Sequence, residues 1–191
     1  ISTQQELDRV IPVVTELAAR GAVVSIDTMR AETAVLAIEA GASIINDVSG
    51  GIADDLMHES VAELGCPYIL MHWRGHSTEM DNKAIYNDVV VEVISELETQ
   101  IKLALEAGIK RNNLIIDPGL GFAKNIEQNW QIVDRIDEFK KLGFPILVGG
   151  SRKRFLQGSE EKSIELTNYL AKKDIWAVRT HSVKPHKEAM R

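Results

Sequence analysis

The sequence predicts an α/β protein built on parallel strands, and three observations support this fold class. Short, continuously apolar runs, such as ILVGG at 146–150, are typical of strands that are buried on both faces. These runs alternate with longer amphipathic stretches that have helical spacing. Four of the amphipathic stretches end in Ala-Gly or Leu-Gly, a pattern typical of helix ends. An open doubly wound sheet and a (β/α)8 barrel both fit this alternation.

The elements follow one another in a regular order along the 191 residues. The apolar runs predict six strands, at 23–27, 43–47, 68–72, 114–117, 146–150 and 176–181. The amphipathic stretches predict helices at 3–20, 31–40, 54–64, 84–107, 126–142, 163–172 and 184–190, with one more helix starting near Ser151. A complete barrel takes about 250 residues. Six strands therefore correspond to a barrel without its first two strands, or to an open sheet, and we expect a single domain across residues 1–191.

Composition excludes several classes of protein. The hydrophobic fraction of 45% allows a sizeable core, while the net charge of −6 argues against a broad basic surface for nucleic acid. A single cysteine, Cys66, excludes an internal disulfide or a metal site with several cysteines, and fits a reducing compartment. The sequence shows no apolar run that could span a membrane and no export leader. We therefore expect a cytoplasmic protein whose partners are small molecules rather than nucleic acid or membrane.

Polar residues stand at the carboxyl ends of the predicted strands. In α/β folds these ends form one rim, so we expect the residues there to converge: Asp27, Asn46, Asp47, Met71, His72, Asp117, the run from Gly149 to Lys153, Arg179 and His181. The acids and the amide can pair with the edge of a flat heterocycle. The cations could hold an anion, and the amino end of a helix starting near Ser151 would also suit one.

Six motifs at these positions resemble those of the dihydropteroate synthase family, in that family's order and over most of residues 2–190. They are IDTMR, IINDVSGG, MHWRG, DPGLGFAKN, LVGGSRKRF and VRTHSV. The pairing of DPGLGF with a later strand that ends in SRK is the most specific of them. The resemblance implies a TIM-type (β/α)8 barrel and a transferase of folate biosynthesis. Such an enzyme condenses 6-hydroxymethyl-7,8-dihydropterin pyrophosphate with 4-aminobenzoate, which gives 7,8-dihydropteroate and pyrophosphate.

The resemblance also implies roles for individual residues. The catalytic residues would be Asp27, Asp117 and Lys153. The pterin-binding residues would be Asp27, Asn46, Met71, Asp117, Phe122, Gly149 and Lys153. The aminobenzoate side would be formed by Ser151, Arg152 and Lys153, and pyrophosphate would be bound by Arg179 and His181. The family reaction is SN1-like: pyrophosphate leaves first, and nearby carboxylates stabilise the resulting cation.

Further expectations follow from the resemblance. Mg2+ is the expected cofactor, and its ligand is an Asn of the family's first strand, so we expect no metal ligand within this chain. That strand and two mobile loops precede the part of the family pattern that this sequence matches, so we expect the barrel to be incomplete at its N-terminus. Sulfonamides would compete with aminobenzoate, and the family implies a homodimer. The chain departs from the pattern at Ser182, where Asp is commoner, and in the short segment 157–163.

Several alternatives stay open at the level of sequence. Asp47 could cap a loop or support Asn46, and His72 could be functional or structural, whereas His186 is expected on the surface. A methyltetrahydrofolate-dependent methyltransferase would share the acids and the amide. It would not need SRK or the pair Arg179 and His181, because its substrate carries no pyrophosphate. A non-catalytic pterin-binding paralogue is the third possibility.

Overall fold

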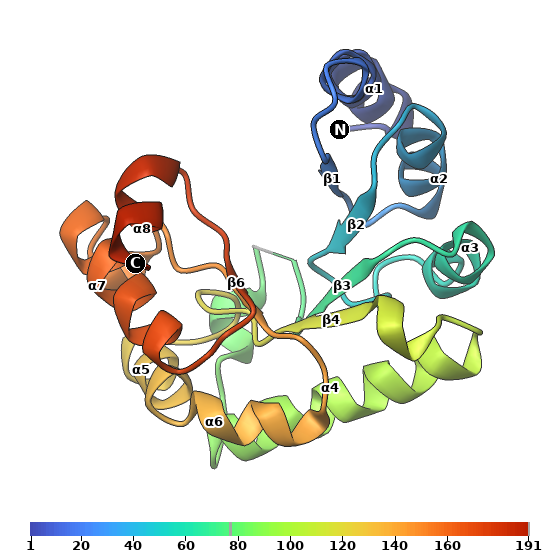
Figure 1. Ribbon diagram of the computed structural model, residues 1–191. Coiled ribbons are helices and arrows are strands. Elements are labelled where there is room, and N and C mark those ends of the chain that lie inside the picture. Colours follow the sequence, from blue (N-terminus) through green and yellow to red (C-terminus); the bar gives the residue numbers. More distant parts are fainter. Residues whose placement is uncertain (77, 191) are drawn as a thin grey trace. The chain divides into compact units, whose positions relative to one another are not determined.

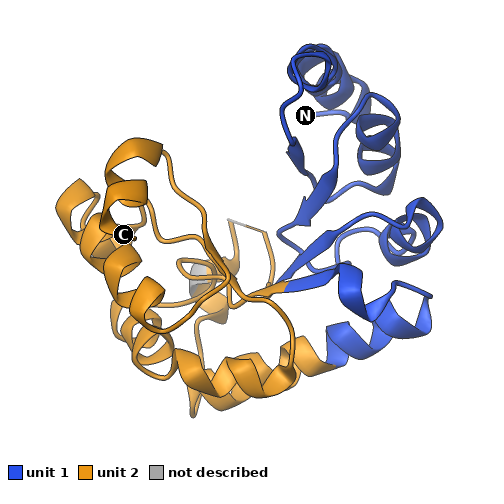
Figure 2. Cartoon of the chain, in the orientation of Figure 1, with its two compact units in different colours: residues 1–71, 99–115 blue, residues 72–98, 116–191 orange. Residues whose placement is uncertain are grey.

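The computed structural model describes residues 1–76 and 78–190, and it divides the chain into two compact units (Figure 2). Unit 1 comprises Ile1–Met71 and Thr99–Ile115, and unit 2 comprises His72–Glu98 and the chain from Ile116 on. Helix α4, Val89–Glu106, and strand β4, Leu114–Asp117, each pass from one unit into the other. Among the described residues, no helix combines the length and the apolar character needed to cross a bilayer.

Unit 1 contains parallel strands with a defined register. Strands β1 (Ser25–Asp27), β2 (Ile44–Asp47) and β3 (Tyr68–Met71) are hydrogen-bonded in the order β1-β2-β3, and β4 follows β3. Asp27 lies opposite Asn46, and Asp47 lies opposite Leu70. Because parallel strands end at the same edge of a sheet, this register brings the polar ends of β1 and β2 together.

Three helices flank these strands: α1 (Thr3–Ala19), α2 (Ala31–Glu39) and α3 (Met57–Leu64). Helix α1 packs against α2, and α2 packs against α3 (Figure 1). A capping box of Ser2 and Gln5 starts α1. Helix α3 ends at Gly65, whose φ of 63° favours glycine. The buried face of α2 consists of small side chains, at Ala31, Thr33, Ala34 and Ala37, which allows a close approach to its neighbours.

Unit 2 contains the second strand pair. Strands β5 (Leu147–Val148) and β6 (Ala177–Val178) are parallel, and an isolated parallel bridge joins Ile116 to Ile146. The helices are α5 (Ile126–Asp134), α6 (Ile136–Phe139), α7 (Glu160–Lys172) and α8 (Val183–Ala189), and α7 packs against α8 (Figure 1). Short 3-10 helices lie at Met80–Lys83, Lys140–Leu142 and Arg154–Leu156, and one in unit 1 lies at Arg111–Asn113.

Within the described residues, all six predicted strands are present, and most predicted helices are too. The predicted helix 126–142 is interrupted at Arg135 and continues as α6 and a 3-10 turn. The helix predicted to start near Ser151 was wrong. Arg152 has a φ of 60° and Lys153 is extended, so the chain turns there and forms a 3-10 helix at Arg154–Leu156 instead. The next α-helix is α7, which Ser159 caps.

Candidate active site

A buried carboxylate marks the end of β4. Asp117 is the last residue of this strand and is 1% exposed. Its Oδ1 accepts the backbone N–H of Gly119 at 2.8 Å. Burial raises the pKa of the Asp117 carboxyl above its usual range, while the Gly119 N–H and the positive charges of Arg179, Lys153 and Lys124 act against that rise. A carboxylate in this setting is well placed to accept hydrogen bonds from a ligand.

Lys153 lies against the loop that follows Asp117. Its Nζ is 4.0 Å from the centroid of the Phe122 ring, a cation–π contact. A Cβ at Gly121 would come within 2.8 Å of the Lys153 side chain, so the glycine allows the lysine to cross the loop. The structure therefore brings together three of the residues predicted to contact the pterin: Asp117, Phe122 and Lys153.

A second group of predicted residues gathers at the ends of β5 and β6. A Cβ at Gly149 would lie 3.1 Å from the Arg179 guanidinium, so glycine allows this close contact. The buried Ser151 Oγ lies 3.1 Å from His181 Nδ1. Strand β6 ends at Val178, which is earlier than the predicted end at residue 181, so Arg179 and His181 follow the strand instead of lying within it. They still lie at the strand end, as predicted for an anion site.

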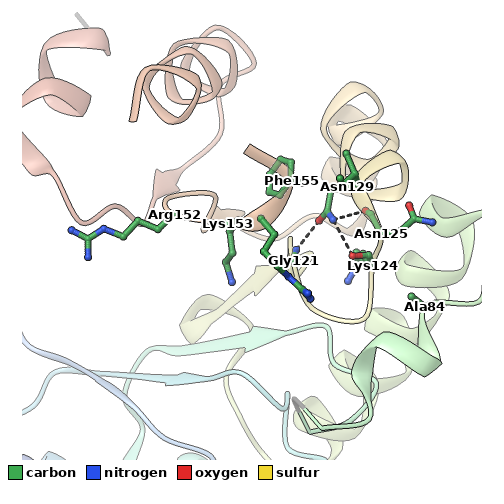
Figure 3. A pocket seen from close by; sticks show the side chains of 10 residues that line it. Ala84, Gly121, Lys124, Asn125, Asn129, Arg152, Lys153 and Phe155 are labelled. Atoms are coloured by element: carbon green, nitrogen blue, oxygen red, sulfur yellow. Dashed lines mark hydrogen bonds between the residues drawn. The ribbon is translucent and has the colours of Figure 1, made fainter. Parts of the chain in front are cut away.

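A cavity of about 430 Å³ opens beside this loop (Figure 3). Its charged lining is basic, and its lining residues include Gly121, Lys124, Asn125, Asn129, Arg152, Lys153, Arg154 and Phe155. Arg152 is exposed and extends away from the Lys124 and Asn129 side of the cavity (Figure 3). Because the helix expected near Ser151 is not formed, its amino end cannot supply the predicted anion site, and the cationic side chains remain as the candidate groups.

In unit 1, the predicted residues form their own cluster. The Asn46 side-chain amide donates to Asp27 Oδ2 at 2.9 Å. Asp47 caps the following loop: it accepts the Ser49 N–H at 2.8 Å, the Ser49 hydroxyl at 2.7 Å and the Gly51 N–H at 2.7 Å. The loop-capping interpretation of Asp47 is therefore the one that the contacts favour. Met71, predicted as an apolar wall, is buried at the end of β3.

The sequence reasoning missed a buried network next to Asp117. Lys124 is buried, and its Nζ lies 2.9 Å from His72 Nδ1. His72 Nε2 in turn lies 3.0 Å from Glu96 Oε2, and Glu96 also accepts hydrogen bonds from Arg74. Lys124 and Arg74 stand within the motifs DPGLGFAKN and MHWRG, and this position could have identified them as candidate site residues from the sequence. Glu96 lies mid-helix in α4, and its spacing in the sequence gave no such indication.

The surface position predicted for His186 was wrong. His186 is 2% exposed, and its Nδ1 lies 2.6 Å from Thr167 Oγ1. The contact joins α8 to α7, and Glu160 Oε1 lies 3.4 Å from His186 Nε2. Histidine is amphipathic and packs in interiors when a polar partner is available, and the partner here becomes apparent only when the two helices meet.

Parallel strands that end in a buried carboxylate, with cationic side chains around it, are typical of the polar ligand sites of α/β enzymes. The sequence profile described as "Pterin binding enzyme" matches residues 1–181. The chain belongs to this family of pterin-binding enzymes.

Individual relatives agree with this assignment. The chain is 43% identical to the dihydropteroate synthase of Mycobacterium leprae over 201 residues, which cover 97% of this chain and 71% of that protein. The dihydropteroate synthase of Thermus thermophilus, solved in complex with 4-aminobenzoate, is 35% identical with a TM-score of 0.92, over 100% of this chain and 77% of that one. The Yersinia pestis dihydropteroate synthase, solved with a sulfonamide drug, is 34% identical with a TM-score of 0.95, over 100% of this chain and 72% of that one.

These structures are TIM-type barrel enzymes, and the likeness confirms the predicted fold class. The six strands that the structure describes are those of the predicted α/β pattern. The likeness extends over the whole of this chain, so both units belong to the same family pattern.

Proposed function

We propose that the chain is a dihydropteroate synthase: a transferase that joins 6-hydroxymethyl-7,8-dihydropterin pyrophosphate to 4-aminobenzoate, giving 7,8-dihydropteroate and pyrophosphate. The observation that carries this proposal is the buried carboxylate of Asp117 at the end of β4, followed by a loop on which Lys153 lies against the Phe122 ring. Relatives with this name that cover nearly all of the chain support it.

The pterin would be bound through its polar edge. Asp117 can accept two hydrogen bonds, from the amino group and from the adjacent ring N–H. Lys153 can donate to the ring carbonyl and a ring nitrogen, while Phe122 offers an apolar face to the ring. The hydrogen-bonded pair Asp27 and Asn46 in unit 1 offers acceptors and a donor of the same kind, and the family resemblance assigns both residues to the pterin.

The chemistry requires the C–O bond to pyrophosphate to break, with the electron pair leaving on the phosphate oxygen. Arg179 would stabilise that charge with its planar fork of donors, and His181 would add one more donor. The negative charge of Asp117 would stabilise the resulting pterin cation. The aminobenzoate nitrogen then forms the new C–N bond and loses a proton. This route needs no protein nucleophile.

The aminobenzoate carboxylate would be held on the side of Ser151, Arg152 and Lys153. The basic cavity lined by Arg152 and Lys153 supports this proposal. A sulfonamide has the same shape as aminobenzoate and would compete there, and the Yersinia pestis relative was solved with such a drug. The exposed position of Arg152 favours a rim contact with the carboxylate over a buried one.

Mg2+, a homodimer and a cytoplasmic location are further proposals that rest on the family resemblance. Among the described residues, no group of three or more His, Cys, Asp or Glu side chains could hold a metal ion.

The test is pyrophosphate release from dihydropterin pyrophosphate with Mg2+ and 4-aminobenzoate, measured for the 191-residue chain and for the full gene product. We expect release that depends on aminobenzoate and falls at least about 100-fold in Asp117→Asn and in Lys153→Ala, because each removes a charged contact made in the transition state. Asp55→Asn and Lys172→Ala change the same residue types on the surface and serve as matched controls. Pterin binding without release by the full gene product would refute the synthase and favour the binding paralogue.

A further inference from the structure

The loop that follows Asp117 has an unusual backbone. Three of its residues have positive φ values: Gly119 at 69°, Gly121 at 78° and Ala123 at 47°. The left-handed region suits glycine, whereas alanine there costs on the order of 1–3 kcal/mol. Such a conformation persists when surrounding contacts determine it. Side-chain contacts must therefore hold this loop in its conformation.

Lys124 makes two hydrogen bonds to the backbone of this loop and contacts His72. Its Nζ donates to the Gly119 carbonyl at 3.0 Å and to the Phe122 carbonyl at 3.0 Å, and it lies 2.9 Å from His72 Nδ1. An ammonium group has three donors, and these three acceptors match them. The side chain thus joins the two ends of the turn that separates Asp117 from the Phe122 ring.

Two further side chains brace the same loop. Asn129 Oδ1 accepts the Gly121 N–H at 2.6 Å, and the Asn129 amide donates to the Lys124 carbonyl at 3.2 Å (Figure 3). The Tyr86 hydroxyl donates to the carbonyl of the strained Ala123 at 3.0 Å. These side chains therefore hold the loop through its backbone groups.

The position of Lys124 is itself fixed by a chain of charged groups. The Glu96 carboxylate lies 3.0 Å from His72 Nε2 and can only accept, so this nitrogen carries the proton and Nδ1 is the acceptor for Lys124. Arg74 donates to both oxygens of Glu96 and also pairs with Glu92. The tautomer of His72 is thus set by Glu96, and the direction of the Lys124 ammonium is set by His72.

We propose that Lys124 is a positioning residue, whose ammonium fixes the 119–123 loop in the shape that presents Asp117 and Phe122 to the pterin. The inference rests on the proposed function and deepens it. Lys124 acts through the loop and not through contact with the reacting atoms. In its protonated form, which donates to all three acceptors, the side chain carries no lone pair that could attack a substrate.

The role of Lys124 depends on its protonated form. Burial lowers the pKa of Lys124 to about 7, while Asp117 and Glu96 raise it and Arg74 and Lys153 lower it. Burial likewise lowers the pKa of His72 to about 4, so the imidazole is neutral near pH 7 and its contact with Glu96 is a hydrogen bond rather than an ion pair. The protonated lysine satisfies all three acceptors, whereas a neutral amine, with two donors, would leave one of them without a hydrogen.

The test replaces the ammonium and measures pterin binding apart from turnover. In the full gene product, Lys124→Met keeps the length of the side chain and removes its donors. We expect the Kd for dihydropterin pyrophosphate, measured by calorimetry without aminobenzoate, to rise at least 10-fold. We expect the KM for this substrate to rise in parallel, and the KM for aminobenzoate to stay within about two-fold. Lys172→Met, an exposed lysine of α7, is the matched control.

If Lys124 had a purely structural role, Lys124→Met would lower the free energy of unfolding, but it would not raise the KM for the pterin substrate more than the KM for aminobenzoate. A second variant, Glu96→Gln, leaves Lys124 in place and weakens the orientation of His72, and it should raise the pterin Kd about three-fold. The inference is overturned if folded Lys124→Met binds the pterin within two-fold of the parent protein. If Lys124→Met does not fold, an unchanged Kd in Glu96→Gln overturns it.

The outcomes also separate this inference from the proposed function. A parent protein that binds the pterin but releases no pyrophosphate would refute the synthase, while the pterin Kd of the two variants would still decide the role of Lys124. A parent protein that does not bind the pterin at all would overturn both.

Discussion

Removing each of two buried hydroxyl groups in unit 1 should change the free energy of unfolding in opposite directions. The Tyr68 hydroxyl donates to Asp47 Oδ2 at 2.8 Å, and both residues are fully buried. The Thr33 hydroxyl in α2 is also fully buried, but it has no hydrogen-bond partner among the described residues. Tyr68→Phe and Thr33→Val each remove one hydroxyl and nearly preserve the shape of the side chain, so they form a matched pair.

The expected size of each effect follows from these contacts. A hydrogen bond to a charged group contributes about 1.5–3 kcal/mol. Asp47 keeps three other donors, from Ser49 and Gly51, when the tyrosine hydroxyl is removed. The loss should therefore be about 2 kcal/mol and not the roughly 3–5 kcal/mol of a buried charge left without a partner. Thr33→Val removes an unsatisfied buried group, and because Thr and Val have similar helix propensity it should stabilise the protein by about 1 kcal/mol.

Equilibrium urea unfolding, followed by far-UV circular dichroism, measures both changes. Because both residues belong to unit 1, the two variants should affect the same transition. In a chain of this size, 1 kcal/mol corresponds to about 2–4 °C in Tm, so Tyr68→Phe should lower Tm by about 4–8 °C and Thr33→Val should raise it by about 2–4 °C. Equal destabilisation by both variants would refute the reasoning, since it would mean that the charged acceptor makes no difference.

Two other predictions concern unit 2. The pKa of His72 is lowered from 6.5 to about 4 by burial, so between these values the unfolded chain binds a proton that the folded chain does not. The free energy of unfolding should therefore fall by roughly 1–3 kcal/mol as the pH drops through this window, at about 1.4 kcal/mol per pH unit. The variant His72→Gln has no imidazole to protonate. Its free energy of unfolding, measured at pH 7 and at pH 4, should therefore fall by less than that of the parent protein. Gly149→Ala places a Cβ 3.1 Å from the Arg179 guanidinium and should raise the KM for dihydropterin pyrophosphate several-fold with little change in Tm. Gly150→Ala, whose Cβ would meet a Leu166 methyl at 2.5 Å, should instead lower Tm, and the reverse pattern would contradict the proposed contact of Arg179 with the anion.

Sequence reasoning was most effective where the signal is local. The strand LIID at 114–117 and the helix starts at residues 3 and 126 depend on neighbouring residues, and the structure has all three. The position of polar residues at strand ends is a consequence of parallel strands, and it was enough to select Asp117, Lys153 and Arg179. The pairing of Asn46 with Asp27 follows from the same rule and from the register of β1 and β2.

Two predictions were wrong because contacts between distant parts of the chain overrode the local sequence pattern. The run after Ser151 has helix-compatible residues, but Arg152 takes a positive φ and the chain turns. His186 was expected on the surface, and it is buried because α8 packs on α7 and brings it to Thr167.

The sequence by itself determined the α/β class, the order of the elements and the identity of the residues at the strand ends, because apolar periodicity and motif spacing are properties of adjacent residues. The tertiary structure alone decided which side chains hold those residues in place. Lys124 and His72 stand 52 positions apart, and the folded chain brings them within 2.9 Å. Such a contact depends on how the chain after β3 meets the loop after β4, where the His72 N–H also donates to the Asp117 carbonyl at 2.9 Å. Burial then lowers the pKa of both side chains. Both are properties of the packed interior that a linear pattern of residue types does not contain.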